Sequence, residues 1–295
     1  MKKKLISILL SAAICLGMCG CSSGNGGSDG NSTSSNETNG SAADNASGTN
    51  SGDDTDWNYI KNKGTFVAGI TYFEPMNYLD ENGELTGFET EFTKAVCEKL
   101  GVTPEFQVID WNKKEIELKS RTIDAIWNGL TVDEDRKENM AFSTPYIRNK
   151  QVIIVKKENA DKYTDTASMA GASIAFEAES AGQAAAEADA TLKDCPHNSC
   201  EAQKDALMEV KAGTSDLGII DYVMATASVG EGTDYNDIQI LDSIELTPEE
   251  YAVGLRLEDV ETVEKINGAI NELAEDGTLK ALCEKYNLAD VYALG

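Results

Sequence analysis

Two short segments, far apart in the chain, place polar residues where a ligand could be bound. Gly129 follows Asp124 by five residues, and Asp221 follows Asp216 with the same spacing. Each segment has the pattern of a helix end, a tight polar turn and a strand that begins at the first aspartate. In open α/β sheets, ligands bind outside the carboxyl ends of the strands. Two such units that face each other would form a cleft with one wall from each.

The histidine and cysteine content argues against several kinds of chemistry. The chain has one histidine, His197, which speaks against a zinc hydrolase or a histidine-dependent catalytic triad. Four cysteines follow the N-terminal region, and they lack the further ligands that a zinc site needs. Cys195 and Cys200 close a short loop, and the sequence leaves open whether they form a disulfide, which would contribute roughly 2 kcal/mol if unstrained. No cofactor and no metal are expected.

Residues 1–20 are predicted to be a lipoprotein signal peptide. Three lysines precede an apolar run, Leu5 to Leu16, that is too short to span a bilayer comfortably. The segment Met18-Cys19-Gly20-Cys21 resembles a bacterial lipobox, and Cys21, preceded by a glycine, is the candidate for acylation with chains such as palmitate. An ordinary secretory signal with incidental cysteines is the alternative.

Residues 21–56 are predicted to be a disordered tether. They are rich in Ser, Gly, Asn, Asp and Thr, and such a segment cannot bury enough apolar surface to offset the entropy of ordering it. The mature protein is therefore expected outside the cytoplasm, attached to the cell membrane through its lipid.

The net negative charge of the chain argues against polyanionic partners. The chain has 51 acidic and 25 basic residues, a net charge of −26 at pH 7. Such a field repels nucleic acids and anionic lipid headgroups, so no nucleic-acid partner is expected. A small ligand responds to local charge and is not restricted by this balance.

The remaining sequence, from residue 57 onward, alternates strand and helix patterns. This alternation predicts an α/β fold with mainly parallel sheets. The clearest helix covers residues 88–100, with Phe88 and Phe92 on one face and Gly101 ending it.

Two local patterns complete the prediction of elements. Thr131 and Glu134 have the Ser/Thr-x-x-Glu spacing of a helix capping box, which predicts that Thr131 opens the helix carrying Arg136. Residues 251–257 are predicted to form one last strand.

A series of motifs, in order and spacing, supports a family resemblance: Gly87-Phe88-Glu89 at a helix start, Asp124-Ala125-Ile126 leading to Gly129-Leu130-Thr131, Arg136, Phe142-Ser143-Thr144-Pro145-Tyr146, Asp216 and Asp221. Over nearly all of residues 64–290 the chain resembles the extracellular solute-binding proteins of polar amino-acid ABC transporters. The resemblance implies two α/β lobes joined by two crossing segments, lobe 1 from residues 57–148 and 250–295 and lobe 2 from 149–249. It implies a monomer, not an enzyme, that traps an amino acid, cystine among the candidates, and delivers it to an ABC permease.

The resemblance also implies which residues bind the ligand. Arg136 would hold the carboxylate, assisted by the amides of Thr131 and Ala181, at the helix that Ser180 opens. Asp221 would hold the ammonium, with the Gly129 carbonyl and the Thr131 hydroxyl as further acceptors. Side-chain selectivity would come from Phe73, Tyr78, Trp127, Asn128 and Phe176, with Glu177 and Glu179 near the second wall.

Two positions depart from the family pattern. Ile70 replaces an aspartate often found in binders of cationic amino acids, which speaks against lysine, arginine or histidine as the ligand. Glu179 replaces a glycine before Ser180, where glycine adopts a positive φ more easily than glutamate.

Two alternative functions remain open. A dehydratase of the same fold, acting on substrates such as arogenate or prephenate, would need an acid or base, which Glu177 or Glu179 could supply. A ligand-sensing lipoprotein would signal through a membrane partner.

Overall fold

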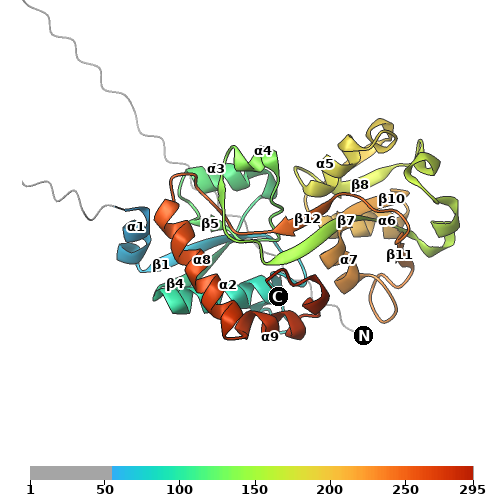
Figure 1. The fold of residues 1–295 in the computed structure, drawn as a ribbon. Coiled ribbons are helices and arrows are strands. Elements are labelled where there is room, and N and C mark those ends of the chain that lie inside the picture. Colours follow the sequence, from blue (N-terminus) through green and yellow to red (C-terminus); the bar gives the residue numbers. More distant parts are fainter. Residues whose placement is uncertain (1–54, 295) are drawn as a thin grey trace, which may run out of the picture. The chain divides into compact units, whose positions relative to one another are not determined.

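The computed structural model describes residues 55–294. The predicted signal peptide, Cys21 and nearly all of the predicted tether lie outside these residues. Figure 1 shows the described part as two α/β lobes, each built on its own sheet, which confirms the predicted fold class. Among residues 55–294, no helix is both long enough and apolar enough to cross a membrane.

The first lobe contains a five-stranded sheet in the order β4-β1-β5-β13-β6. The three strands β4, β1 and β5 pair in parallel, and β13 pairs antiparallel with β5 and β6. The strands of this sheet are β1 (Thr65–Ile70), β4 (Thr103–Val108), β5 (Ala125–Ile126), β6 (Ala141–Phe142) and β13 (Gly254–Leu255). The same lobe holds the hairpin of β2 (Tyr78–Leu79) and β3 (Leu85–Thr86), and helices α1 (Asp56–Lys63), α2 (Phe88–Leu100), η1 (Trp111–Lys113), α3 (Lys114–Lys119), α4 (Glu134–Lys137), α8 (Val260–Glu275), α9 (Thr278–Lys285) and η5 (Ala289–Val291).

The second lobe contains a sheet in the order β11-β7-β10-β8-β9. Strands β10, β8 and β9 pair in parallel, whereas β7 runs antiparallel to β10 and β11. Its strands are β7 (Ile147–Lys156), β8 (Ile174–Glu177), β9 (His197–Cys200), β10 (Leu217–Asp221) and β11 (Ile238–Ile240). Its helices are η2 (Lys157–Lys162), η3 (Thr166–Met169), α5 (Ala181–Ala188), η4 (Leu192–Asp194), α6 (Gln203–Ala212) and α7 (Tyr222–Ser228).

Two paired segments carry the chain between the lobes. Strand β12 (Pro248–Tyr251) pairs antiparallel with the first residues of β7, with Asn149 opposite Glu249 and Ile147 opposite Tyr251. The later residues of β7 pair instead with β10 and β11. In Figure 1 the two strands lie side by side between the sheets, and they are the crossing segments of the fold.

Helix α2 shows how the sequence dictates one of these elements. It covers the predicted residues, and Gly101 ends it in the left-handed conformation, with φ of 71°. Phe88, Phe92 and Val96 lie on one face and are buried in the core of the first lobe. Each such side chain contributes about 1.5–3 kcal/mol by leaving water, which fixes this face of the helix against the sheet.

Two local predictions were wrong. Asp133, not Thr131, caps the helix that carries Arg136, because its carboxylate accepts the Arg136 backbone N–H at 2.8 Å. Thr131 instead forms a bridge with Tyr251. The predicted single strand 251–257 is two strands, β12 and β13, which belong to different sheets.

The candidate disulfide between Cys195 and Cys200 is not formed; both thiols are free. The segment predicted as a loop contains strand β9, in which His197 to Cys200 pair with Ile174 to Glu177 of β8. An extended chain rises about 3.3 Å per residue, so this strand alone separates its ends by about 10 Å. A disulfide needs Cα atoms within about 7 Å of each other, and the strand therefore prevents it.

Candidate functional site

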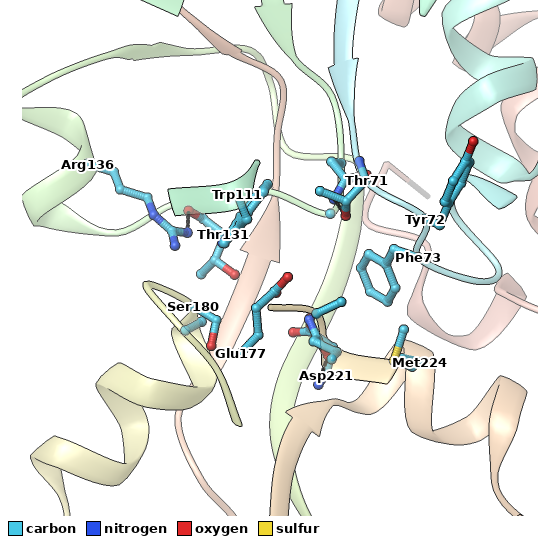
Figure 2. A pocket seen from close by; sticks show the side chains of 15 residues that line it. Thr71, Tyr72, Phe73, Trp111, Thr131, Arg136, Glu177, Ser180, Asp221 and Met224 are labelled. Carbon is cyan, nitrogen blue, oxygen red and sulfur yellow. Dashed lines mark hydrogen bonds between the residues drawn. The ribbon is translucent and has the colours of Figure 1, made fainter. Parts of the chain in front are cut away.

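A cavity opens where strands of both sheets end. It has a volume of about 20 Å³, roughly the space of one water molecule, so its walls are nearly in contact. Thr71 follows β1, Gly129 follows β5, and Asp221 ends β10, so the structure brings the two predicted segments to one cavity. The lining residues, most of them labelled in Figure 2, are Thr71, Tyr72, Phe73, Trp111, Asn128, Gly129, Thr131, Arg136, Glu177, Ser180, Ala181, Ala202, Gln203, Asp221 and Met224.

Arg136 is the cation of the first wall. The residue is 8% exposed. Its guanidinium is fixed by Asp133, whose Oδ2 lies 3.1 Å from Nε, and by the Thr131 carbonyl, to which Nη1 donates at 2.8 Å. Nη2 donates to the Glu179 carbonyl of the second wall at 3.5 Å. One N–H on each of Nη1 and Nη2 has no partner among residues 55–294. A carboxylate accepts such a pair of parallel donors.

Asp221 is the buried anion of the second wall, with 4% of its surface exposed. Its Oδ1 accepts hydrogen bonds of 2.6 Å from the side-chain amides of Asn149 and Gln151, and its Oδ2 accepts one from Gln203. Although Asp221 occupies the N-cap position of α7, its side chain makes no capping bond. No cation pairs with this carboxylate within residues 55–294. A buried carboxylate held only by neutral donors is suited to an ammonium group.

Gly129 shapes the first wall through its missing side chain. Its φ is +54°, and a Cβ at this position would overlap the ring of Phe73. Glu89 of α2 fixes the backbone there, because both of its oxygens accept the Gly129 N–H, at 2.8 and 3.0 Å. Only glycine satisfies both the positive φ and the close approach of the ring.

The start of α5 supplies donors from the second wall. The Ser180 hydroxyl caps this helix by accepting the Gln183 N–H at 3.2 Å, and the first N–H groups, including that of Ala181, have no acceptor within the helix. Glu179 before it has a φ of 56°, the left-handed conformation that glycine adopts easily. Its carbonyl accepts hydrogen bonds from Lys114 at 3.2 Å and from Arg136, which hold the turn in place.

Two further ionisable groups are buried at the site. Glu177, at the end of β8, is 6% exposed, and burial together with the charge of Asp221 raises its pKa to about 8. Burial and the charge of Arg136 lower the pKa of Lys114 to about 8. The Lys114 ammonium lies over the Trp111 ring, 4.7 Å from its centroid.

The structure brings eight of the predicted ligand-binding residues together and leaves three out. Trp127 is fully buried and packs edge-on against Phe66 and Phe92 in the core. Phe176 is buried in the core of the second lobe. Successive side chains of a strand point to opposite sides, so in β8 Glu177 faces the cavity instead of Phe176. In the turn after β5, Asn128 lines the cavity instead of Trp127.

Tyr78 is the third predicted residue that does not line the cavity. It belongs to the β2–β3 hairpin and lines a separate groove with Lys285 and Tyr286. The prediction followed the aromatic side chain, whereas the hairpin turns Tyr78 away from the strand ends.

Sequence reasoning missed six lining residues: Thr71, Tyr72, Trp111, Ala202, Gln203 and Met224. Thr71 and Tyr72 directly follow β1, and the rule that ligands bind at strand ends could have found them. Met224 lies one helical turn after Asp221, on the same side of α7. Gln203 follows the unpredicted strand β9, so nothing in the sequence pointed to its position.

Comparisons with known proteins agree on one family. Residues 66–289 match the model of the bacterial extracellular solute-binding proteins, family 3. The L-cystine-binding protein TcyJ of Escherichia coli (strain K12) is 27% identical over 235 residues, which cover 79% of this chain and 86% of TcyJ.

Solved structures show the same fold. The structure of Tv2483 bound to L-arginine superposes with a TM-score of 0.76 at 26% identity, covering 82% of this chain and 98% of that one. An ABC uptake transporter substrate-binding protein from Streptococcus pneumoniae with bound histidine has a TM-score of 0.72 at 33% identity. The match covers 82% of this chain and 99% of that one. With the family match over most of its length, this chain belongs to the bacterial extracellular solute-binding proteins, family 3.

Proposed function

We propose that the protein binds a free α-amino acid in this cavity and delivers it to an ABC transporter permease. The observation that carries the proposal is the charge arrangement of the two walls. A fixed guanidinium lies on one wall, Arg136, and a buried carboxylate without a cation lies on the other, Asp221. These groups complement the carboxylate and the ammonium of a zwitterion.

The amino acid would contact both lobes at once. Its carboxylate would accept the free N–H groups of Arg136 and those at the start of α5, with the Ser180 hydroxyl as a further donor. Its ammonium would donate to Asp221 and to the Gly129 carbonyl. The Thr131 hydroxyl donates to Glu249 at 2.9 Å and could still accept a hydrogen bond from the ligand.

The relatives support a ligand of this class. By their names and titles, those compared bind cystine, arginine and histidine, which share the α-carboxylate and α-ammonium and differ in the side chain. Isothermal titration calorimetry of the mature chain with the standard amino acids and cystine tests the proposal. Binding of none of them would contradict it.

A lipid anchor at Cys21 would keep the protein near its permease. We expect Cys21→Ser to release the mature protein from membranes without changing its amino-acid affinity, because the tether separates the anchor from the binding lobes. Membrane fractionation measures the release, and Cys19→Ser is the matched control that should stay bound. Retention of the Cys21→Ser protein on membranes would contradict lipidation at this cysteine.

Binding would close the two lobes around the ligand. The cavity is too small to admit an amino acid, so the walls must separate before binding, and β7 and β12 near residues 148–151 and 247–251 would act as hinges. The ligand would shift the population toward the closed form by binding that form more tightly. Small-angle scattering should show a smaller radius of gyration with the amino acid than without it. An equal radius in both states, with binding confirmed, would contradict the closure.

A dehydratase of the same fold is the second candidate function. The observation that favours it is the buried Glu177 carboxyl in the cavity, which has a pKa of about 8 and could act as a general acid. Incubation with prephenate and arogenate decides between the two functions, since an enzyme would release product with turnover and a binding protein would not.

A further inference from the structure

Glu177 presents a buried carboxyl to the cavity that no neighbour pairs with. It is 6% exposed, and its side chain makes no hydrogen bond or ion pair with any residue in the range 55–294. Figure 2 shows it extending from the second wall into the space between the Arg136 and Asp221 sides. A buried carboxyl without a donor is costly unless a ligand supplies one.

The ionisable groups of the cavity outnumber those that a neutral amino acid would pair with. The lining contains one cation, Arg136, and two carboxyl groups, Asp221 and Glu177. If the backbone of the amino acid pairs with Arg136 and Asp221, as in the proposed function, Glu177 remains without a partner. A positive charge on the ligand side chain would give Glu177 the partner that it lacks.

Among residues 55–294, Lys114 is the one other cation that acts on Glu177, and the structure gives it different partners. Its ammonium donates to the carbonyls of Trp111 and Glu179, both at 3.2 Å, and lies over the Trp111 ring. It forms no ion pair with Glu177. Ile70, whose type the sequence analysis took as evidence against a cationic ligand, is buried and does not line the cavity, so Glu177 is the lining group that could meet such a charge.

Resting on the proposed function, we propose that Glu177 selects a basic amino acid, one whose side chain carries a positively charged nitrogen. The aromatic residues Tyr72, Phe73 and Trp111 also line the cavity, and aromatic faces attract such cations, a guanidinium above all. Cystine fits less well, because its second carboxylate would meet no second cation in the lining. Glu177 thus contacts the side chain of the ligand, Arg136 its α-carboxylate and Asp221 its α-ammonium.

The test compares arginine with citrulline, its uncharged analogue of nearly the same shape, by calorimetry on the mature chain at pH 8.5. The wild-type protein should bind arginine at least about tenfold more tightly than citrulline. Glu177→Gln should remove most of this preference while leaving the citrulline affinity within about threefold. Glu158→Gln, the same change at an exposed side chain of the second lobe outside the cavity lining, should keep the preference.

A second measurement detects whether Glu177 releases its proton when the ligand binds. Burial, together with the charges of Asp221 and Asp205, raises the pKa of Glu177 and favours its protonated form, whereas Lys114 and Arg136 favour its carboxylate. Arginine should therefore release a proton at pH 7, seen as a dependence of the binding enthalpy on the buffer, and Glu177→Gln should release less. An unchanged proton release in this variant would contradict the assignment.

The remaining outcomes separate the two proposals. Three outcomes would overturn the role of Glu177 and leave amino-acid binding intact. The wild-type protein could bind arginine and citrulline equally, it could bind glutamine or cystine more tightly than arginine, or Glu177→Gln could keep the wild-type selectivity. No binding of any amino acid or of cystine by the folded wild-type protein would overturn the proposed function itself. Thermal unfolding of each variant confirms that it is folded before binding is measured.

Discussion

Replacing Arg136 with alanine is expected to lower the affinity for the amino acid by about 30-fold to several-thousand-fold, without unfolding the protein. The substitution leaves the ligand carboxylate desolvated without its cation, and the loss of one member of such a pair costs about 2–5 kcal/mol. Asp221→Asn should have an effect of similar size, because it removes the charge that faces the ammonium while keeping the shape of the side chain. Titration calorimetry measures both.

Two matched variants control for general effects of charge. Arg121→Ala removes an exposed guanidinium 3.8 Å from Glu258, outside the cavity. Asp216→Asn removes a carboxylate that binds Ser173 at the opposite end of β10 from Asp221. Both should leave the affinity within about twofold. Unchanged affinity in Arg136→Ala or Asp221→Asn would place the binding site elsewhere.

Elements fixed by local chemistry could be predicted from the sequence. Helix α2 was predictable because its apolar face recurs with the helical period and Gly101 supplies a left-handed end. Strand β9 was missed because its side chains are polar, and it exists only through pairing with β8. The start of α4 was misplaced because Thr131 and Asp133 are both acceptable caps, and the long-range bridge of Thr131 with Tyr251 decides between them.

The candidate site was predictable to the level of the segment rather than of the side chain. Gly129 and Asp221 reach one cavity because they follow or end strands of the α/β pattern, and Arg136 reaches it from within the short helix α4. Which of Phe176 and Glu177 faces the cavity depends on the register of the short strand β8, and which of Trp127 and Asn128 does so depends on the turn after β5. Sequence patterns fix neither. The sequence analysis chose the aromatic residue of each pair, Trp127 and Phe176, and both are buried in the core.

Glu89→Ala is expected to lower the free energy of unfolding by about 3–5 kcal/mol. Glu89 is fully buried and accepts hydrogen bonds from Gly129, from the Asn77 amide at 2.9 Å and from the Tyr146 hydroxyl. Alanine would leave the Gly129 N–H and the Tyr146 hydroxyl without an acceptor, and each such loss costs about 1–3 kcal/mol. The Asn77 amide would lose one of its three acceptors and keep the Trp127 carbonyl and Asn128 Oδ1. Chemical denaturation measures the change. Glu91→Ala on the same helix is the matched control, since its partly exposed pair with Lys285 should contribute no more than about 1 kcal/mol.

The pH dependence of this difference gives a second check on Glu89. Burial raises its pKa from 4.5 to about 7, so between these values the folded protein holds a proton that the unfolded chain has released. The resulting stabilisation is complete below pH 4.5 and is lost as the pH rises through 7. The gap in unfolding free energy between the wild-type protein and Glu89→Ala should therefore be larger at pH 5 than at pH 8, by more than about 1 kcal/mol. A gap that stayed constant would mean that Glu89 is already ionised at pH 5, and that the carboxylate itself, rather than its protonated form, anchors Gly129 beneath the cavity.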